Sequence, residues 1–170
     1  MAEEHVPVDL CSEWVAGEIA TRYLIVSHFI HNLPPKYGAA ILEDIKKANY
    51  EAGYVAGRTT ASALGKNDLK TLGNLFGGRK VLDPEVVYLS DERAIVHWRR
   101  CPVSTLMPTF EEWGLSDDYL ETVCHIVELF DSGFVEGFNP NLTTQTPPEL
   151  GETGLQKKGD FCSVVIMKKR

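Results

Sequence analysis

Small residues recur at every fourth position of one predicted helix. Pro34-Pro35 open a helical segment that can run to Gly65, and its small-residue stripe comprises Gly53, Gly57, Ala61 and Gly65. Residues four apart share a helix face, so this face is nearly flat and lets another backbone or a flat ligand come close. Glycine inside a helix costs about 1 kcal/mol relative to alanine, so an offsetting gain is required. Tight packing within the fold is the simplest explanation, while a dimer contact and a ligand wall stay open.

Composition and charge narrow the classes of function. The chain has 170 residues, is 44% hydrophobic and carries a formal net charge of −7. This length suits one domain that buries its own core. Nucleic acid and anionic membrane surfaces would be repelled over most of such a molecule. The first residues lack the pattern of a signal peptide, and no segment approaches the ~18 apolar residues of a membrane span. We therefore expect a cytoplasmic protein with reduced cysteines that binds neither nucleic acid nor membrane.

The first half of the chain has the pattern of helices. Apolar residues recur at helical spacing over residues 12–32, which predicts an amphipathic helix that ends before Pro34. Asn67 is the expected cap of a short helix over residues 68–76, which the following pair of glycines ends.

The second half is mixed. Residues 85–89 and 93–99 read as two strands joined by a tight polar turn, with Trp98 on one face of the second strand and His97 on the other. A long helix is predicted from Ser116 or Asp117 to Phe134, and strands over residues 142–146 and 161–168. The predicted fold class is α+β, with long helices packed on a small, mainly antiparallel sheet. We expect one domain over residues 1–170, of which 1–80 are mainly helical.

Three cysteines of the second half are the first candidates for chemistry. Cys101 follows the second hairpin strand, where Arg99 and Arg100 would lower its pKa if they point at it, so it is the preferred nucleophile. Cys124 is expected to be buried in the long helix, and Cys162 to lie on the core face of the last strand.

A metal site is the other interpretation of these cysteines. Together with a histidine, Cys101, Cys124 and Cys162 could hold a single divalent ion, with zinc as the first choice. Their wide spacing lacks the paired ligands of a zinc signature. A chain without any cofactor and with three core cysteines therefore stays an open alternative.

The predicted long helix also carries a polar face. Glu121, His125 and Glu128 lie at i, i+4 and i+7, which aligns two carboxylates and an imidazole. Such a face could hold a metal or support acid–base catalysis. A solvated polar stripe explains the same spacing equally well.

Four short motifs in fixed order resemble a known family. They are Arg100-Cys101-Pro102, the mid-helix Cys124, residues 137–143 (GFNPNLT) and residues 159–165 (GDFCSVV). In this order, over residues 86–167, they resemble the L-2-amino-thiazoline-4-carboxylic acid hydrolase-like family. The resemblance implies an α+β fold and hydrolytic opening of a cyclic amidine.

Such a reaction would assign roles to the candidate residues. Cys101 as a thiolate would attack the amidine carbon, with His97 or His125 carrying the proton and Glu128 as a further catalytic candidate. Metal-activated hydroxide is the alternative route. Substrate binding would fall to Arg99, Arg100 and Glu121, since a guanidinium binds a carboxylate at two points.

The same features also resemble the ligand-binding domains of vinyl-reductase type, which are sensors or accessory proteins for small molecules. A binding domain needs an apolar cavity beside the face of residues 53–65, whereas a hydrolase needs polar groups that converge on Cys101 or His125. A homodimer that uses the small-residue stripe is a third hypothesis.

Overall fold

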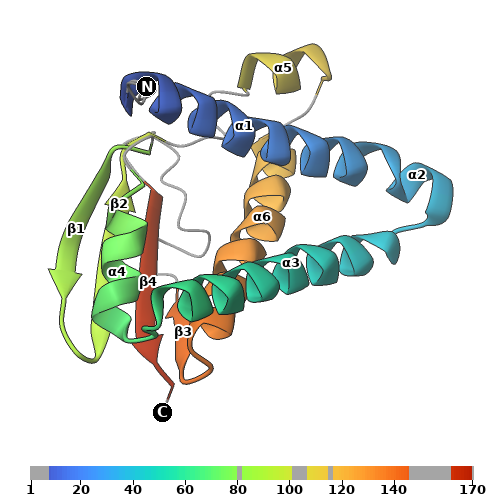
Figure 1. The fold of residues 1–170 in the computed structure, drawn as a ribbon. Helices are drawn as coiled ribbons and strands as arrows, with labels where there is room; N and C mark the ends of the chain where they lie inside the picture. Colours follow the sequence, from blue (N-terminus) through green and yellow to red (C-terminus); the bar gives the residue numbers. More distant parts are fainter. Residues whose placement is uncertain (1–7, 80–81, 101–106, 115–116, 146–161, 170) are drawn as a thin grey trace, which may run out of the picture.

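The computed structural model of the chain describes residues 8–79, 82–100, 107–114, 117–145 and 162–169. The elements in chain order are α1 (Val8–Asn32), α2 (Pro34–Tyr37), α3 (Ile41–Leu64), α4 (Leu69–Gly77), β1 (Pro84–Leu89), β2 (Arg93–Trp98), α5 (Met107–Glu112), α6 (Asp117–Phe138), β3 (Leu142–Gln145) and β4 (Cys162–Lys168). The strands form one antiparallel sheet in the order β1-β2-β4-β3. The predicted α+β class is confirmed (Figure 1).

The helical first half differs from the prediction between α2 and α3 and at the start of α1. A single helix from Pro34 to Gly65 is wrong, because Gly38 has a φ of +85° and separates α2 from α3. Glycine adopts this left-handed conformation at little cost, and a helix cannot continue through it. Gly65 caps the end of α3 with a φ of +61°. α1 also starts earlier than predicted, at Val8.

The short helix α4 is capped by Asp68, one residue after the predicted cap. An Oδ1 atom of Asp68 accepts a hydrogen bond from the backbone N–H of Thr71 at 2.9 Å. This hydrogen bond lowers the pKa of Asp68 below its ordinary value. Helix α5 was not predicted, and α6 continues one turn beyond the predicted end at Phe134.

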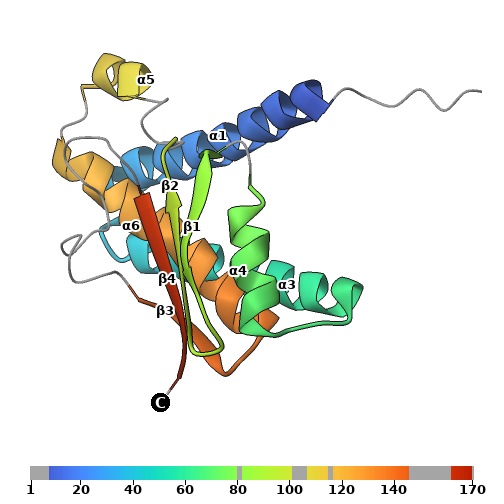
Figure 2. The same cartoon turned by 90° about the vertical axis from the view of Figure 1, so that its left-hand side faces the viewer.

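The predicted hairpin and its two faces are confirmed. Along β2 burial alternates, with Ala94, Val96 and Trp98 buried and the residues between them half-buried. β4 lies between β2 and β3, and its residues Val164 and Ile166 face the same core. Helix α4 and the end of α3 lie on one side of the sheet (Figure 2). The opposite side carries His97, whose cross-strand neighbours are residues 85 and 163.

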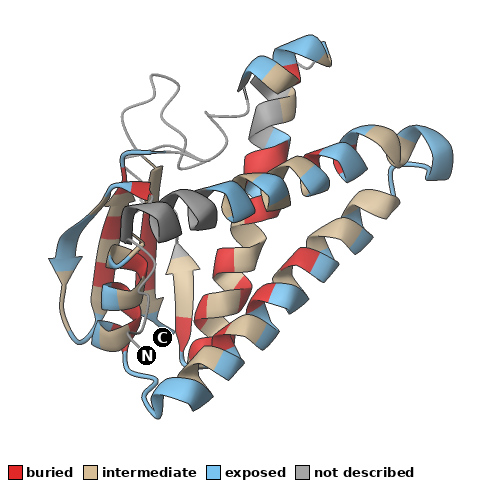
Figure 3. Ribbon diagram, turned by 45° about the horizontal axis from the view of Figure 1, so that its top comes forward, coloured by how far each residue is buried: buried red, intermediate tan, exposed pale blue. Residues whose placement is uncertain are grey.

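Helix α6 connects the two apolar clusters of the molecule. The larger cluster lies between the sheet, α4 and the second half of α6, and the smaller one between α1 and the first half of α6. The smaller cluster comprises Ile30, Val123, Ile126 and Val127, with partly buried side chains from α3 packed against it. Buried residues accordingly follow α6 along most of its length (Figure 3).

The small-residue stripe of α3 packs directly against the backbone of α6. A Cβ atom added to Gly53 or Gly57 would lie 2.0 Å from the carbonyl oxygen of Phe130 or Phe134, respectively. One turn earlier, Asn49 donates from Nδ2 to the carbonyl of Ile126 at 2.6 Å. Tight packing within the fold is therefore confirmed for these glycines. They are neither a ligand wall nor a dimer contact, because α6 of the same chain covers them.

The partner helix contributes a second pair of glycines. A Cβ atom on Gly133 or Gly137 would lie 2.0 Å from the carbonyl oxygen of Tyr50 or Tyr54. The contacts are reciprocal because the two helices share a similar sequence, EAGYVAG at residues 51–57 and DSGFVEG at residues 131–137. Gly53 lies against Phe130, and Gly57, one turn later, lies against Phe134, one turn later in α6. The helices α3 and α6 therefore run parallel at this crossing. Such an approach also brings Cα–H groups close to carbonyl oxygens, which is weakly favourable.

A half-buried phenol links the first half of α6 to α1. The hydroxyl of Tyr119 donates a hydrogen bond to the carbonyl of Ser27, and burial raises the pKa of Tyr119 to about 12. The neutral phenol is the form that donates. Its contribution to stability is therefore complete below the unfolded pKa of about 10 and is lost as the pH rises from there through 12.

We expect Tyr119→Phe to remove part of the alkaline loss of stability. Between pH 10 and pH 12 the free energy of unfolding, measured by urea titration, should fall less steeply in this variant than in the wild-type protein. Tyr37, which is 70% exposed, provides the matched control. Tyr37→Phe should follow the wild-type curve, and equal slopes for Tyr119→Phe and wild type would contradict the assignment.

Candidate functional site

A half-buried arginine lies among aromatic rings where α4, β2 and α6 meet. The Cζ atom of Arg79 is 4.3 Å from the ring centroid of Phe76, 5.6 Å from that of Trp98 and 5.9 Å from that of Phe134. Its Nη1 atom is 3.1 Å from Oδ1 of Asp131. We call these five residues the guanidinium site.

Local structure fixes the position of Arg79. Helix α4 ends at Gly77, and the backbone N–H of Arg79 donates back to the carbonyl of Phe76 at 3.3 Å. The carbonyl of Arg79 accepts from the N–H of Leu82 at 2.9 Å. The indole N–H of Trp98 reaches the same Phe76 carbonyl at 3.5 Å. The turn after α4 is thus held from both sides.

The charges of the site are unequally exposed. The side chain of Asp131 is 12% exposed and that of Arg79 is 28% exposed. A guanidinium over aromatic faces gains from the ring quadrupoles in addition to its ion pair. The hydrogen bond to Asp131 uses one nitrogen of the Arg79 guanidinium, a group that carries five N–H donors, so donors remain for a second acceptor.

A second arginine lies over the neighbouring ring of α6. The rings of Phe130, Phe134 and Phe138 stack at centroid distances of 6.5 and 6.4 Å, and we call them the aromatic ladder. The Cζ atom of Arg22, from α1, lies 4.2 Å from the centroid of Phe130. Two guanidinium groups from separate elements therefore contact successive rings of one helix face.

Two of the three candidate cysteines, Cys124 and Cys162, lie within the described residues. Cys124 is buried in α6 as predicted, and Cys162 is half-buried and packs against the larger core cluster, with Trp98 as its cross-strand neighbour. Cys101 lies outside the described residues. Within the described ranges no group of three or more His, Cys, Asp and Glu side chains could hold a metal. The three-cysteine zinc site stays a prediction.

The two candidate histidines lie apart from the thiol of Cys162. His97 belongs to the outer side of the sheet, whereas Cys162 belongs to the side that faces the helices. His125 is exposed on α6. Glu128 is half-buried on the same helix, and the side chain of Glu121 lies outside the described part. Glu121, His125 and Glu128 all belong to α6, as their spacing predicts, and their catalytic role stays a prediction.

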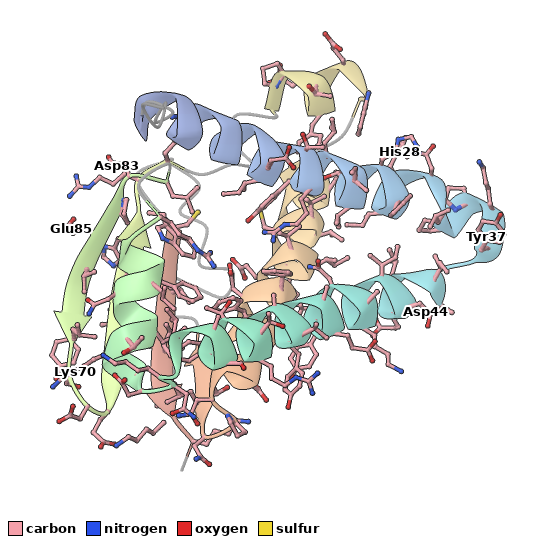
Figure 4. The ribbon with its side chains drawn as sticks, in the orientation of Figure 1. His28, Tyr37, Asp44, Lys70, Asp83 and Glu85 are labelled. Carbon is pink, nitrogen blue, oxygen red and sulfur yellow. The ribbon has the colours of Figure 1, made fainter. Side chains whose placement is uncertain are left out.

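The predicted substrate-binding arginines lie at the end of the hairpin. Arg99 is exposed, and its hydrogen bond and ion pair with Glu85 raise the pKa of the Arg99 guanidinium. Glu85 lies on the outer strand β1 (Figure 4). Arg100 is also exposed, and its backbone N–H donates to the carbonyl of Leu82.

The sequence did not predict Arg79 or Arg22 as site residues. Arg79 and Asp131 are 52 residues apart, and neither belongs to a short motif. One signal was available: Phe130, Phe134 and Phe138 recur every four residues on one helix face beside Asp131. Such spacing predicts an aromatic stripe with an acidic group at its edge, although it does not identify the cationic partner.

Comparisons with known proteins find no relative: no family model matches the chain, and neither a curated protein nor a solved structure matches it. Among the described helices, none has the length and apolar character that crossing a membrane requires.

Proposed function

We propose that the chain is a non-enzymatic domain that binds a small molecule at the guanidinium site, as a sensor or accessory protein in the cytoplasm. The observation that carries this proposal is the enclosure of Arg79 by three aromatic rings from three different elements. Ligand sites are mostly apolar and use a small number of fixed polar groups for orientation. Arg79 and Asp131 supply such groups, and the arginine keeps contact with solvent.

The location differs from the one expected for a binding domain. The face of Gly53 and Gly57 is covered by α6 and cannot line a cavity. An open depression on α3 is lined by Arg58, Thr59, Ser62 and Ala63 and lacks aromatic walls. The guanidinium site, with its contribution from the ladder ring of Phe134, is the better candidate because aromatic rings and fixed charge lie together there.

Amidine hydrolysis stays a prediction. It depends on polar groups that converge on Cys101 or His125, and Cys101 lies outside the described residues. His125 is exposed and His97 lies on the outer side of the sheet, so the described candidates do not converge. We prefer ligand binding because Arg79 contacts both Asp131 and the three aromatic rings around it.

An uncharged fluorescent probe tests the proposal. N-phenyl-1-naphthylamine should bind saturably with one probe per chain, measured by its fluorescence increase. Phe134→Ala should weaken this binding by about tenfold, because it removes one ring of the enclosure. Tyr54→Ala is the matched control, since Tyr54 is the counterpart of Phe134 in the repeated segment and is 39% exposed.

Circular dichroism must confirm that both variants remain folded before their affinities are compared. Absence of saturable binding to the wild-type protein would contradict the proposed function. Equal affinities of the folded Phe134→Ala variant and the wild type would contradict the location.

A further inference from the structure

We propose that α3 binds α3 of a second copy of the chain, with the two helices antiparallel and a two-fold axis beside Val55. The surface concerned is the outer face of α3, opposite the glycines that pack against α6, and it is separate from the proposed ligand site. The inference depends on three features of this face: exposed apolar side chains at its middle, charges of opposite sign on either side of them, and a depression beside one of these charges.

Apolar side chains are exposed at the middle of α3. Exposed residues follow the side of α3 that is turned away from α6 (Figure 3). Val55 is 54% exposed and Tyr54 is 39% exposed. Ala48 and Ala52, also exposed, precede Val55 by two turns and by one turn on the same face. In the repeated segment of α6 the counterpart of Val55 is Val135, which is fully buried in the larger cluster. A second copy would cover Val55 as the sheet covers Val135.

Charged side chains of opposite sign flank Val55. Glu51 lies four residues before it and Arg58 three residues after it, and both are exposed on the same face. An oxygen of Glu51 lies 3.9 Å from Nζ of Lys47, but these side chains are 62% and 73% exposed, so their contact contributes little. Arg58 forms no ion pair with any other described residue. The same surface therefore presents an available guanidinium group and a carboxylate that can accept from it.

Only an antiparallel arrangement brings these charges together. About a two-fold axis beside Val55, Glu51 of each copy lies against Arg58 of the other, so two ion pairs form at once. A parallel pair would place identical residues together, with Glu51 against Glu51 and Arg58 against Arg58. Like charges that face each other across an interface repel. The charge pattern thus selects the antiparallel dimer.

The depression on α3 fits the same arrangement. It is lined by Arg58, Thr59, Ser62 and Ala63. In the antiparallel pair it lies opposite Lys47 and Glu51 of the second copy. Long side chains of one copy therefore enter where the small side chains of the other leave space, as a well-packed interface requires.

The outer face of α3 differs in charge from the chain as a whole. The net charge of −7 makes two copies repel each other over most of their surface. Between residues 47 and 62 the charged residues are Lys47, Glu51 and Arg58, two positive and one negative. The general repulsion is therefore weakest where this face meets its equivalent. One helix from each copy makes a small interface, so we expect a dissociation constant of about 10 μM.

Charge reversal tests the contact. In sedimentation velocity the full chain should approach twice the 18.9 kDa of one copy as its concentration rises. Glu51→Arg and Arg58→Glu should each raise the dissociation constant by at least about tenfold, because like charges then meet at both contacts. An equimolar mixture of the two variants should form a heterodimer with an affinity within about threefold of wild type, because every contact in it joins opposite charges.

Two further variants locate the interface. Val55→Lys places two positive charges beside the axis and should also raise the dissociation constant by at least about tenfold. Val87→Lys is the matched control, since Val87 is a valine of β1 that is 48% exposed. This variant should dimerise like the wild type. All these positions are exposed, and circular dichroism must show the native signal for each variant.

Several results would overturn the inference. A wild-type chain that stays monomeric at about 1 mM lacks the interface. A dimer that the charge reversals leave intact, or one that Val87→Lys dissociates, uses a different surface. A mixture of the two charge-reversed variants that stays monomeric contradicts the antiparallel pairing. None of these results affects the proposed function, because no residue of the guanidinium site belongs to α3.

Discussion

Gly57→Ala should lower the free energy of unfolding by about 3 kcal/mol or more. The added Cβ atom would lie 2.0 Å from the carbonyl oxygen of Phe134 and 2.8 Å from the backbone N of Phe138. Both neighbours are backbone atoms of a helix, so no side-chain rotation relieves the clash and α3 and α6 must separate. The separation would weaken the packing of both helices along their crossing. Urea denaturation followed by circular dichroism measures the effect.

Gly17→Ala is the matched control for this prediction. Gly17 lies in α1, and an added Cβ atom would meet nothing within 4 Å. Alanine is the better helix former by about 1 kcal/mol, so this variant should be as stable as the wild type or more stable. A Gly57→Ala variant of wild-type stability would contradict the crossing. A folded variant that changes from dimer to monomer in size-exclusion chromatography would instead place the stripe at a subunit contact.

Asp131→Ala should destabilise the protein by about 2–3 kcal/mol. The carboxylate is 12% exposed and balances the guanidinium of Arg79, which would remain half-buried among aromatic rings without a counter-charge. Breaking a fully buried pair costs more, but the side chain of Arg79 is 28% exposed and can turn partly toward water. Thermal or urea unfolding of the purified variant measures the loss.

A double-mutant cycle separates the ion pair from the loss of packing. The double variant Arg79→Met, Asp131→Leu should lose less unfolding free energy than the two single variants lose in total. We expect a difference of at least about 1 kcal/mol, because the double variant leaves neither charge without its partner. The exposed pair of Lys70 and Asp91 is the control. Figure 4 shows Lys70 at the periphery, on α4. Lys70→Ala should change stability by no more than about 1 kcal/mol. Additive effects in the Arg79 and Asp131 cycle would contradict the coupling.

Local patterns were sufficient for most of the secondary structure. Alternating burial along β2 follows from a period of two, which the sequence shows directly in Ala94, Val96 and Trp98. The break at Gly38 was missed because helix propensity alone does not show that a glycine adopts a positive φ. The predicted end of α6 was one turn too early, at Phe134, because Gly133 and Gly137 lie in its last two turns. Glycine there weakens the isolated helix, and only the packing of α3 against it offsets the cost.

The candidate site shows the limit of local reasoning more clearly. The cysteine and histidine candidates belong to short motifs that can be recognised in the sequence. The predicted burial of Cys124 is confirmed. The aromatic enclosure of Arg79 involves residues from three elements, and no spacing in the chain relates them. Within the described residues the buried Nε atom of Arg22 makes no hydrogen bond, and no residue pattern in the sequence predicts this.

The sequence by itself determined the α+β class, the hairpin with its two faces and the flat stripe on α3, because each depends on residues that are near neighbours in the chain. The tertiary structure alone decided that α6 covers the stripe and that Arg79 meets Asp131. These contacts join residues 77 and 52 positions apart, as for Asn49 with Ile126 and for the ion pair. Their partners are selected by shape and charge once the helices pack, so the physical information lies in the packed arrangement and not in any local segment.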